Sequence, residues 1–278
     1  MLRKATVPTL LFSAALAGSP AIAQKKAAAP TPAPAHVAGG GEKAPAQSPS
    51  SSSSEVARAA ERKLDGWRTA EARADLEPIA AQAATNADVA VALGRVLEQE
   101  GKYGESEKVL RAAAAAVPSD ARVALGLGET LLRERKTSEA DAEFRRAADL
   151  AARAAADRPG DATAFRSKGT ALSRLRRYDE AIEALARARA LDGGDASTLY
   201  QMGATRAFQQ RWAEAVDLLN QTVAKDAGTA MAYYYRGLAQ EKLGRKDLMV
   251  LDLDRFVKLA PSAPEAERAR ALLAASTR

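Results

Sequence analysis

Cysteine is absent from this chain of 278 residues, and histidine occurs only once. Without cysteine, no disulfide supports the fold and no lipid-bearing cysteine can follow a cleavage site. The single histidine, His36, lies in a segment rich in alanine and proline. Thiol and imidazole nucleophiles, and zinc sites built on cysteine or histidine, are therefore excluded from the repeats described below. We predict no catalytic residues, no enzyme activity, no metal site and no cofactor.

Aromatic residues are scarce, at 5% of the chain, and alanine is abundant, which suits thin and closely packed helices. The formal charge of +6 is concentrated at the start of the chain. Residues 1–52 contain five basic residues and one acidic residue, Glu42, whereas the rest is close to neutral with both signs mixed. A mixed surface of this kind lacks the basic patch of a nucleic-acid-binding protein. We therefore predict no nucleic-acid partner.

Residues 1–23 have the pattern of a secretory signal peptide. Arg3 and Lys4 give a positive start, the apolar run 10–17 follows, and Ala21-Ile22-Ala23 matches a cleavage signal. The apolar run is too short for a membrane-spanning helix. We predict cleavage before Gln24, an exported protein that is periplasmic or secreted and not a lipoprotein, and no transmembrane segment after cleavage. An uncleaved anchor and a chance apolar start are the alternatives.

Residues 24–54 are rich in alanine, proline and serine, a composition that cannot bury enough apolar surface to order the chain. We predict a disordered linker there. Residues 55–86 carry two weaker helical patterns. Trp67 followed by Ala70 imitates the start of a second repeat helix, and Pro78 predicts an interruption of that helix. This stretch is expected to be a degenerate N-terminal repeat that acts as a cap.

Glycine marks a repeat along the rest of the chain. Five glycines interrupt strong helical patterns at spacings of 34, 41, 34 and 34 residues: Gly94, Gly128, Gly169, Gly203 and Gly237. A glycine inside a helix costs about 0.5–1 kcal/mol relative to alanine. Close approach of a neighbouring helix is the natural compensation. The longer spacing adds seven residues, almost two helical turns, so it lengthens a helix while keeping its buried face.

Other positions keep the same register. Small residues recur at the twentieth position of the units, among them Ala140, Ala181 and Ala215, and large apolar residues recur at the twenty-fourth. Pro118, Pro159 and Pro261 fall at the ends of units. This pattern resembles the tetratricopeptide repeat family, whose unit is a helix–turn–helix of 34 residues. The resemblance implies an all-α fold, a right-handed solenoid of antiparallel helix pairs.

The predicted organisation follows from this register. It comprises a signal peptide (1–23), a linker (24–54), a degenerate N-terminal repeat (55–86), repeats at 87–120, 121–161 with a seven-residue helix extension, 162–195 and 196–229, a degenerate repeat (230–263) and a C-terminal capping helix (264–278). The alanine-rich end of the long helix, residues 151–156, is expected to project beyond its neighbours.

In this family the first helix of each unit lines a concave groove that binds a segment of another protein. Carried onto this chain, the resemblance predicts eight groove residues: Arg95, Arg133, Arg166, Arg174, Tyr200, Gln201, Phe208 and Tyr234. Aromatic and arginine side chains are common anchors of interfaces. We expect an apolar part of the partner near the aromatic residues and an acidic part near the last three arginines. For Tyr235 the core and the groove are equal alternatives, because three consecutive tyrosines cannot share one side of a helix.

The asparagines of the carboxylate clamp that some repeat proteins use for chaperone C-termini are missing, since the ninth positions hold other residues. The sequence thus predicts a non-enzymatic scaffold for a protein partner, with assembly of an envelope complex in a bacterial periplasm suggested by analogy alone. The main alternative is a structural solenoid of the envelope that associates with itself. A ligand carrier or enzyme and a cytosolic protein are further alternatives.

Overall fold

The computed structural model describes residues 49–276, all of which belong to one compact unit, Ala46–Arg278. The predicted signal peptide and most of the predicted linker lie outside the described residues. The end of that linker does not: helix α1 spans Pro49–Asp65. Its residues Ala57, Ala60 and Leu64 are fully buried. Packing of this apolar stripe stabilises a helix whose serine-rich start is a poor helix former by itself.

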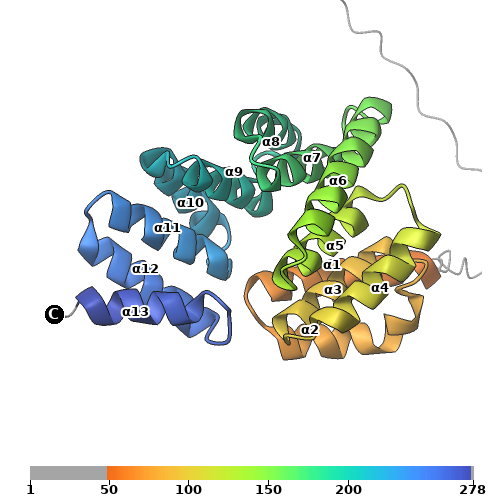
Figure 1. The fold of residues 1–278 in the computed structure, drawn as a ribbon, viewed down its shortest axis with the longest axis horizontal. Helices are drawn as coiled ribbons and strands as arrows, with labels where there is room; N and C mark the ends of the chain where they lie inside the picture. Colours follow the sequence, from red (N-terminus) through yellow and green to blue (C-terminus); the bar gives the residue numbers. More distant parts are fainter. Residues whose placement is uncertain (1–48, 277–278) are drawn as a thin grey trace, which may run out of the picture. The chain divides into compact units, whose positions relative to one another are not determined.

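The described residues form successive helix pairs (Figure 1). The first helices of the five repeats are α3 (Ala87–Gln99), α5 (Ala121–Arg133), α7 (Ala162–Arg174), α9 (Ala196–Phe208) and α11 (Ala230–Lys242). The second helices are α4 (Tyr103–Ala116), α6 (Thr137–Asp157), α8 (Tyr178–Asp192), α10 (Trp212–Lys225) and α12 (Lys246–Leu259). Each starts at the first or the seventeenth position of its unit, so the predicted register and the all-α solenoid are confirmed.

Local sequence explains where several helices begin and end. The side chains of Asn86, Asp120 and Asp161 accept hydrogen bonds from backbone N–H groups in the first turns of α3, α5 and α7. Such caps satisfy donors that a helix leaves unpaired. Pro118 and Pro159 follow the ends of α4 and α6, where a proline cannot continue the helix.

The five repeat glycines lie where the two helices of a unit touch. A Cβ atom added to Gly128, Gly169 or Gly203 would lie 2.6, 2.5 or 2.7 Å from a large side chain of the second helix. The shortest corresponding distances at Gly94 and Gly237 are 3.0 and 2.9 Å. The partner side chain in every unit is the twenty-fourth residue: Leu110, Phe144, Leu185, Leu219 and Leu253. The predicted close approach of the helices is confirmed.

A left-handed residue joins the two helices of each unit. The fifteenth position has positive φ in all five repeats, at Gly101, Arg135, Arg176, Gln210 and Gly244. Trp67, which lies 34 residues before Gly101, also has positive φ. This register shows that our interpretation of Trp67 as the start of a second helix was wrong. The second helix of the N-terminal unit, α2 (Thr69–Leu76), begins two residues later, and its buried small residue is Ala72. Trp67 instead occupies the turn, with φ 58°.

The two ends and the long helix complete the unit. A 3₁₀ segment with Pro78 in its first turn, η1 (Glu77–Gln82), follows α2, as the proline predicts. Helix α13 (Ala266–Ser276) buries Ala266 and Ala269 against the last repeat. The extended end of α6 also packs, because Ala151 and Ala155 are buried there, so only its other faces project. Within residues 49–276, no helix combines the length and the apolar character needed to cross a bilayer.

We expect Gly169→Ala to lower the free energy of unfolding by about 1–3 kcal/mol, the usual cost of overpacking. The new methyl group would meet Leu185 Cγ at 2.5 Å and the carbonyl oxygen of Ala181 at 2.9 Å. That clash outweighs the gain of about 0.5–1 kcal/mol in helix propensity. Urea denaturation followed by circular dichroism measures the change. Gly160→Ala is the control, because its Cβ meets nothing within 4 Å; equal midpoints for the two variants would contradict the assigned register.

Candidate protein-binding hollow

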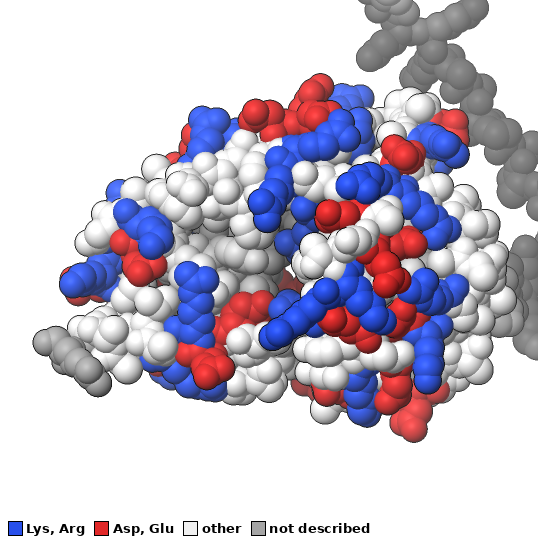
Figure 2. Space-filling view, in the orientation of Figure 1, with Lys and Arg blue, Asp and Glu red and all other residues white. Residues whose placement is uncertain are grey.

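The face of the molecule in Figure 2 is hollowed near its centre, with lysine and arginine atoms along one side of the hollow and mostly uncharged surface along the other. An aromatic cluster from two first helices lies among the residues of the concave side. Phe208 and Tyr200 come from α9 and Tyr235 comes from α11. All three are neither fully buried nor fully exposed. We call these three residues the aromatic cluster.

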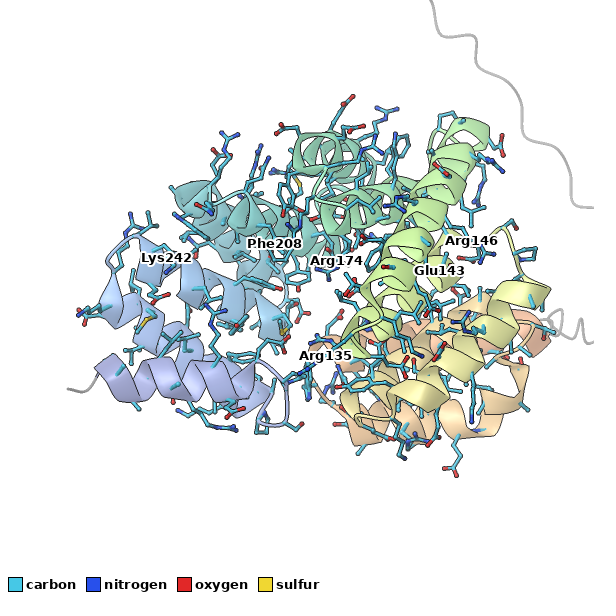
Figure 3. All side chains as sticks on the ribbon, viewed as in Figure 1. Arg135, Glu143, Arg146, Arg174, Phe208 and Lys242 are labelled. Atoms are coloured by element: carbon cyan, nitrogen blue, oxygen red, sulfur yellow. The ribbon has the colours of Figure 1, made fainter. Side chains whose placement is uncertain are left out.

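Edge-to-face and tilted contacts hold the aromatic cluster together. The ring centroids of Phe208 and Tyr235 are 5.5 Å apart with nearly perpendicular planes, and those of Tyr200 and Tyr235 are 6.3 Å apart. The guanidinium of Arg174, on α7, lies 5.9 Å from the centroid of Phe208, and Figure 3 shows these two side chains on neighbouring elements. Burial is the main reason that the pKa of Tyr200 is raised well above its ordinary value. The cluster is therefore a largely dehydrated aromatic surface.

One predicted groove residue belongs to the core. Tyr234 is 4% exposed and packs between α11 and α12, with its ring centroid 5.0 Å from that of Phe256. Burial raises the pKa of its hydroxyl. A partner cannot reach this side chain, so its assignment to the groove was wrong. Tyr235 takes the groove position, because successive helical residues point about 100° apart and only one of the pair can face the hollow.

The predicted arginines are all paired with carboxylates of the chain itself. Arg95 donates to Glu61 at 2.9 Å and to Asp65 at 2.8 Å. Arg174 pairs with Glu129 through a short contact. These pairs join first helices of different units, and each charge of the arginine is balanced locally. The acidic partner segment that we expected near the arginines would have to displace these carboxylates.

The two remaining arginines pair with carboxylates elsewhere in the chain. Arg166 approaches the loop before α9, with Asp195 at 3.5 Å and Asp192 at 3.6 Å. Arg133, at the end of α5, donates to Glu265 at 3.1 Å. Of the predicted groove residues, the structure thus brings together Arg174, Tyr200 and Phe208 around one surface. Gln201 is half-buried on α9, and Thr205 donates to its backbone oxygen at 2.7 Å.

The eight predicted groove residues do not include Glu98 and Glu129, two acidic side chains of first helices. Glu98 of α3 accepts a hydrogen bond from Thr130 of α5, whose hydroxyl lies 2.9 Å from that of Ser106. Burial raises the pKa of Glu98 to about 7; the Thr130 hydrogen bond opposes this rise and the neighbouring charge of Glu129 adds to it. Glu98 and Glu129 are the twelfth and ninth residues of their repeats, and both positions face the groove in this family. Their position in the repeat is therefore the sequence signal that could have identified them.

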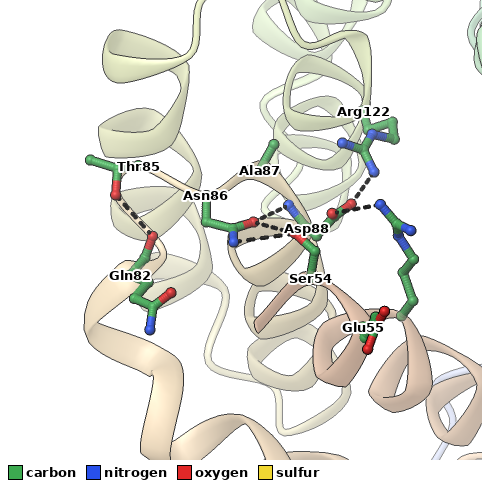
Figure 4. Close-up of a pocket in the computed structure, with 9 residues that line it drawn as sticks. Ser54, Glu55, Gln82, Thr85, Asn86, Ala87, Asp88 and Arg122 are labelled. Carbon is green, nitrogen blue, oxygen red and sulfur yellow. Dashed lines mark hydrogen bonds and ion pairs between the residues drawn. The ribbon is translucent and has the colours of Figure 1, made fainter. Parts of the chain in front are cut away.

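A polar cavity of about 540 Å³ lies at the other end of the unit, near the start of α3 (Figure 4). Three of its charged side chains are paired with one another. Asp88 pairs with Arg58 at 3.2 Å and with Arg122 at a shorter distance, and Asn86 caps α3. Among residues 49–276, no group of three or more histidine, cysteine, aspartate or glutamate side chains could hold a metal ion.

We expect the free energy of unfolding to depend on Glu98 between the ordinary glutamate pKa of 4.5 and its folded value of about 7. In this window the folded state keeps a proton that the unfolded chain releases, so stability falls as the pH rises. Glu98→Gln stays neutral and should gain stability relative to wild type between about pH 5 and about pH 8. Urea midpoints measured across that range test this. Glu105→Gln, at an exposed carboxylate of α4, is the control; a difference between Glu98→Gln and wild type that is constant with pH would refute the raised pKa.

Comparisons with known proteins agree with this geometry. Two solved structures share the fold. One is the TPR protein TTC0263 of Thermus thermophilus, with 18% identity and a TM-score of 0.52 over 68% of this chain and 97% of that chain. The other is a chain of the APC/C hetero-tetramer Cut9–Hcn1, with 15% identity and a TM-score of 0.52 over 81% of this chain and 43% of that chain. No curated protein matches the chain.

Three family models match, each described as a tetratricopeptide repeat. They cover residues 68–128, 119–193 and 200–264. Together these ranges include more than half of the chain and span all five repeats. The chain belongs to the tetratricopeptide repeat family.

Proposed function

We propose that this protein is a scaffold that binds a segment of another protein in its concave hollow. The observation that carries the proposal is the aromatic cluster, in which Tyr200, Phe208 and Tyr235 meet on the concave side without being buried in the core. Solenoids use such concave surfaces for binding. Aromatic side chains in dehydrated pockets supply most of the free energy of many interfaces. Membership of a family of non-enzymatic interaction scaffolds supports the same role.

The chemistry of the cluster favours an apolar or aromatic segment of the partner. Arg174 is stacked near Phe208, but its charge is balanced by Glu129. Arg95 is likewise balanced by two carboxylates. An acidic segment would gain little from arginines that are already paired, whereas an apolar side chain would bury further aromatic surface at about 25 cal/mol per Å². The partner segment is therefore anchored by apolar groups.

We expect Phe208→Ala to weaken binding at least about tenfold, or about 1.4 kcal/mol, because it removes one of the three rings of the cluster. Peptides selected from a displayed random library against the full chain serve as probes, and titration calorimetry gives their dissociation constants. Leu251→Ala is the matched control, since Leu251 is 66% exposed on α12 and outside the cluster. Circular dichroism checks that both variants keep their helices.

Two results would contradict this function. Equal affinities of wild type and Phe208→Ala would move the interface away from the aromatic cluster. Selection that recovers no peptide, together with a molar mass that rises with concentration, would favour the structural alternative of self-association. The observation that favours self-association is a pair of exposed leucines. Leu248 and Leu251 are 44% and 66% exposed and share one face of α12.

We propose further that the mature protein works outside the cytoplasm, in a bacterial envelope, where it assists assembly of a larger complex. Support comes from the sequence of residues 1–23, with Arg3, Lys4 and the Ala21-Ile22-Ala23 signal. N-terminal sequencing of the protein purified from its native source should begin at Gln24. A sequence that begins at Met1 would place the protein in the cytosol or on an uncleaved anchor.

A further inference from the structure

The first and last units of the solenoid touch each other. In repeat proteins each unit contacts its neighbours along the chain. Here the indole N–H of Trp67, in the turn between α1 and α2, donates to Ser262 Oγ at 3.2 Å across 195 positions of sequence. Arg133 donates to Glu265 at 3.1 Å across 132 positions. In Figure 1 the α1–α2 connection accordingly lies beside the connection between α12 and α13.

Apolar packing accompanies these polar contacts. The ring of Trp67 packs against the buried cluster of α11, α12 and α13 that contains Tyr234 and Phe256. A Cβ atom on Gly66 would lie 3.5 Å from the carbonyl oxygen of Gly228, so the two backbones also come close. We call the four side chains that join the units the clasp: Trp67, Arg133, Ser262 and Glu265.

Trp67 is an unusual choice for its backbone position. Its φ of 58° is in the left-handed region, where a bulky residue is unfavourable. The equivalent turns hold glycine at Gly101 and Gly244 and a long polar residue elsewhere. A glycine would relieve the backbone at this turn but could not reach the last unit. The contacts of the indole with the C-terminal cluster are what offsets the unfavourable conformation.

The clasp is small compared with the contacts inside the repeats. Its hydrogen bond is exposed, and the Arg133 side chain is 40% exposed in its ion pair with Glu265. Exposed pairs of this kind contribute little stability. A cavity of about 280 Å³ is also lined jointly by residues 67–71, Pro261 and Ser262, so the packing between the two ends is incomplete. The joined form should therefore predominate in wild type, but by less free energy than the fold of either unit, so the clasp can open without unfolding them.

The clasp joins the early units to the end of the chain on which the aromatic cluster lies. Arg133, at the end of α5, pairs with Glu265 before α13, while the cluster residues Tyr200 and Tyr235 lie on α9 and α11. Trp67 of the clasp and Tyr235 of the aromatic cluster both pack against the buried cluster that contains Phe256. A ring closed in this way admits a free chain end along its axis.

We propose that the clasp is a reversible closure that controls lateral access of a partner segment to the aromatic cluster. The consequence for a partner rests on the proposed function, but the closure itself does not. An internal segment flanked by folded domains must wait for the clasp to open, because it cannot be threaded along the axis. Only the molecules with an open clasp can then bind such a segment. A change in the open fraction changes the apparent affinity for the segment, and the rate of its binding, in proportion.

Trp67→Gly is the variant that opens the clasp, since glycine suits the positive φ of this turn and removes the indole. Gln210→Gly makes the same change at the equivalent turn of the fourth repeat, where φ is 62°, and is the matched control. The chain has no cysteine, so introduced thiols are unique. Spin labels on Ala74→Cys and Ala271→Cys, two exposed positions on α2 and α13, report the distance between the ends by pulsed electron paramagnetic resonance.

A second readout measures access without any partner. A single thiol at Tyr200→Cys reacts with N-ethylmaleimide and, separately, with a maleimide carried on a gold nanocluster. We expect a single narrow end-to-end distance in wild type and in Gln210→Gly, and a broader, longer distribution in Trp67→Gly. Reaction with the bulky maleimide should be at least about tenfold faster in Trp67→Gly, as a tenfold larger open fraction requires, while reaction with the small maleimide changes little.

Either readout can overturn the proposal. A broad distance distribution in wild type would mean that the ends are not joined. Longer distances in Trp67→Gly with an unchanged rate for the bulky maleimide would mean that the clasp exists but does not control access. Neither measurement uses a peptide, so a failure of the proposed binding function leaves both results interpretable.

Discussion

Close approach of the two helices in each repeat is the contact on which the structure depends. It requires one helix to have no side chain at the crossing point and the other to present a large one. Gly169 and Leu185 show the constraint most sharply, since even a methyl group at Gly169 would lie 2.5 Å from the leucine. The same pair of positions recurs in every repeat, so the local helix geometry is copied along the chain and the solenoid curvature accumulates from it.

That curvature has two consequences in this chain. It places the first helices of successive units on one concave side, where Tyr200 and Phe208 of α9 meet Tyr235 of α11. It also brings the turn at Trp67 back to Ser262, near the other end of the described residues. The binding surface and the contact that encloses it therefore have one origin, the small rotation between neighbouring repeats. A change in repeat packing would alter both together.

The charged side chains of the concave side mainly form ion pairs between neighbouring units. Arg95 joins α3 to α1 through Glu61 and Asp65, and Arg174 joins α7 to α5 through Glu129. Buried or half-buried ion pairs of this kind cost desolvation and seldom add much net stability, but they specify which surfaces meet. Because these arginines are already paired with carboxylates, the aromatic cluster is the part of the concave side that would bury the most apolar surface on binding a partner.

The sequence by itself determined the repeat, because a period of 34 residues is enforced locally: a glycine, a small residue and a large residue must recur wherever two helices cross. It also determined the first residue of the first helix in each repeat and the interruption at Pro78. Only the tertiary structure decided which of Tyr234 and Tyr235 faces the hollow, since the run of three tyrosines faces several sides of one helix. Only the tertiary structure showed which carboxylate pairs with each arginine and that Trp67 contacts Ser262. Those contacts join residues that are up to 195 positions apart, and such distances are set by the summed rotation of all the repeats, which no single stretch of sequence contains.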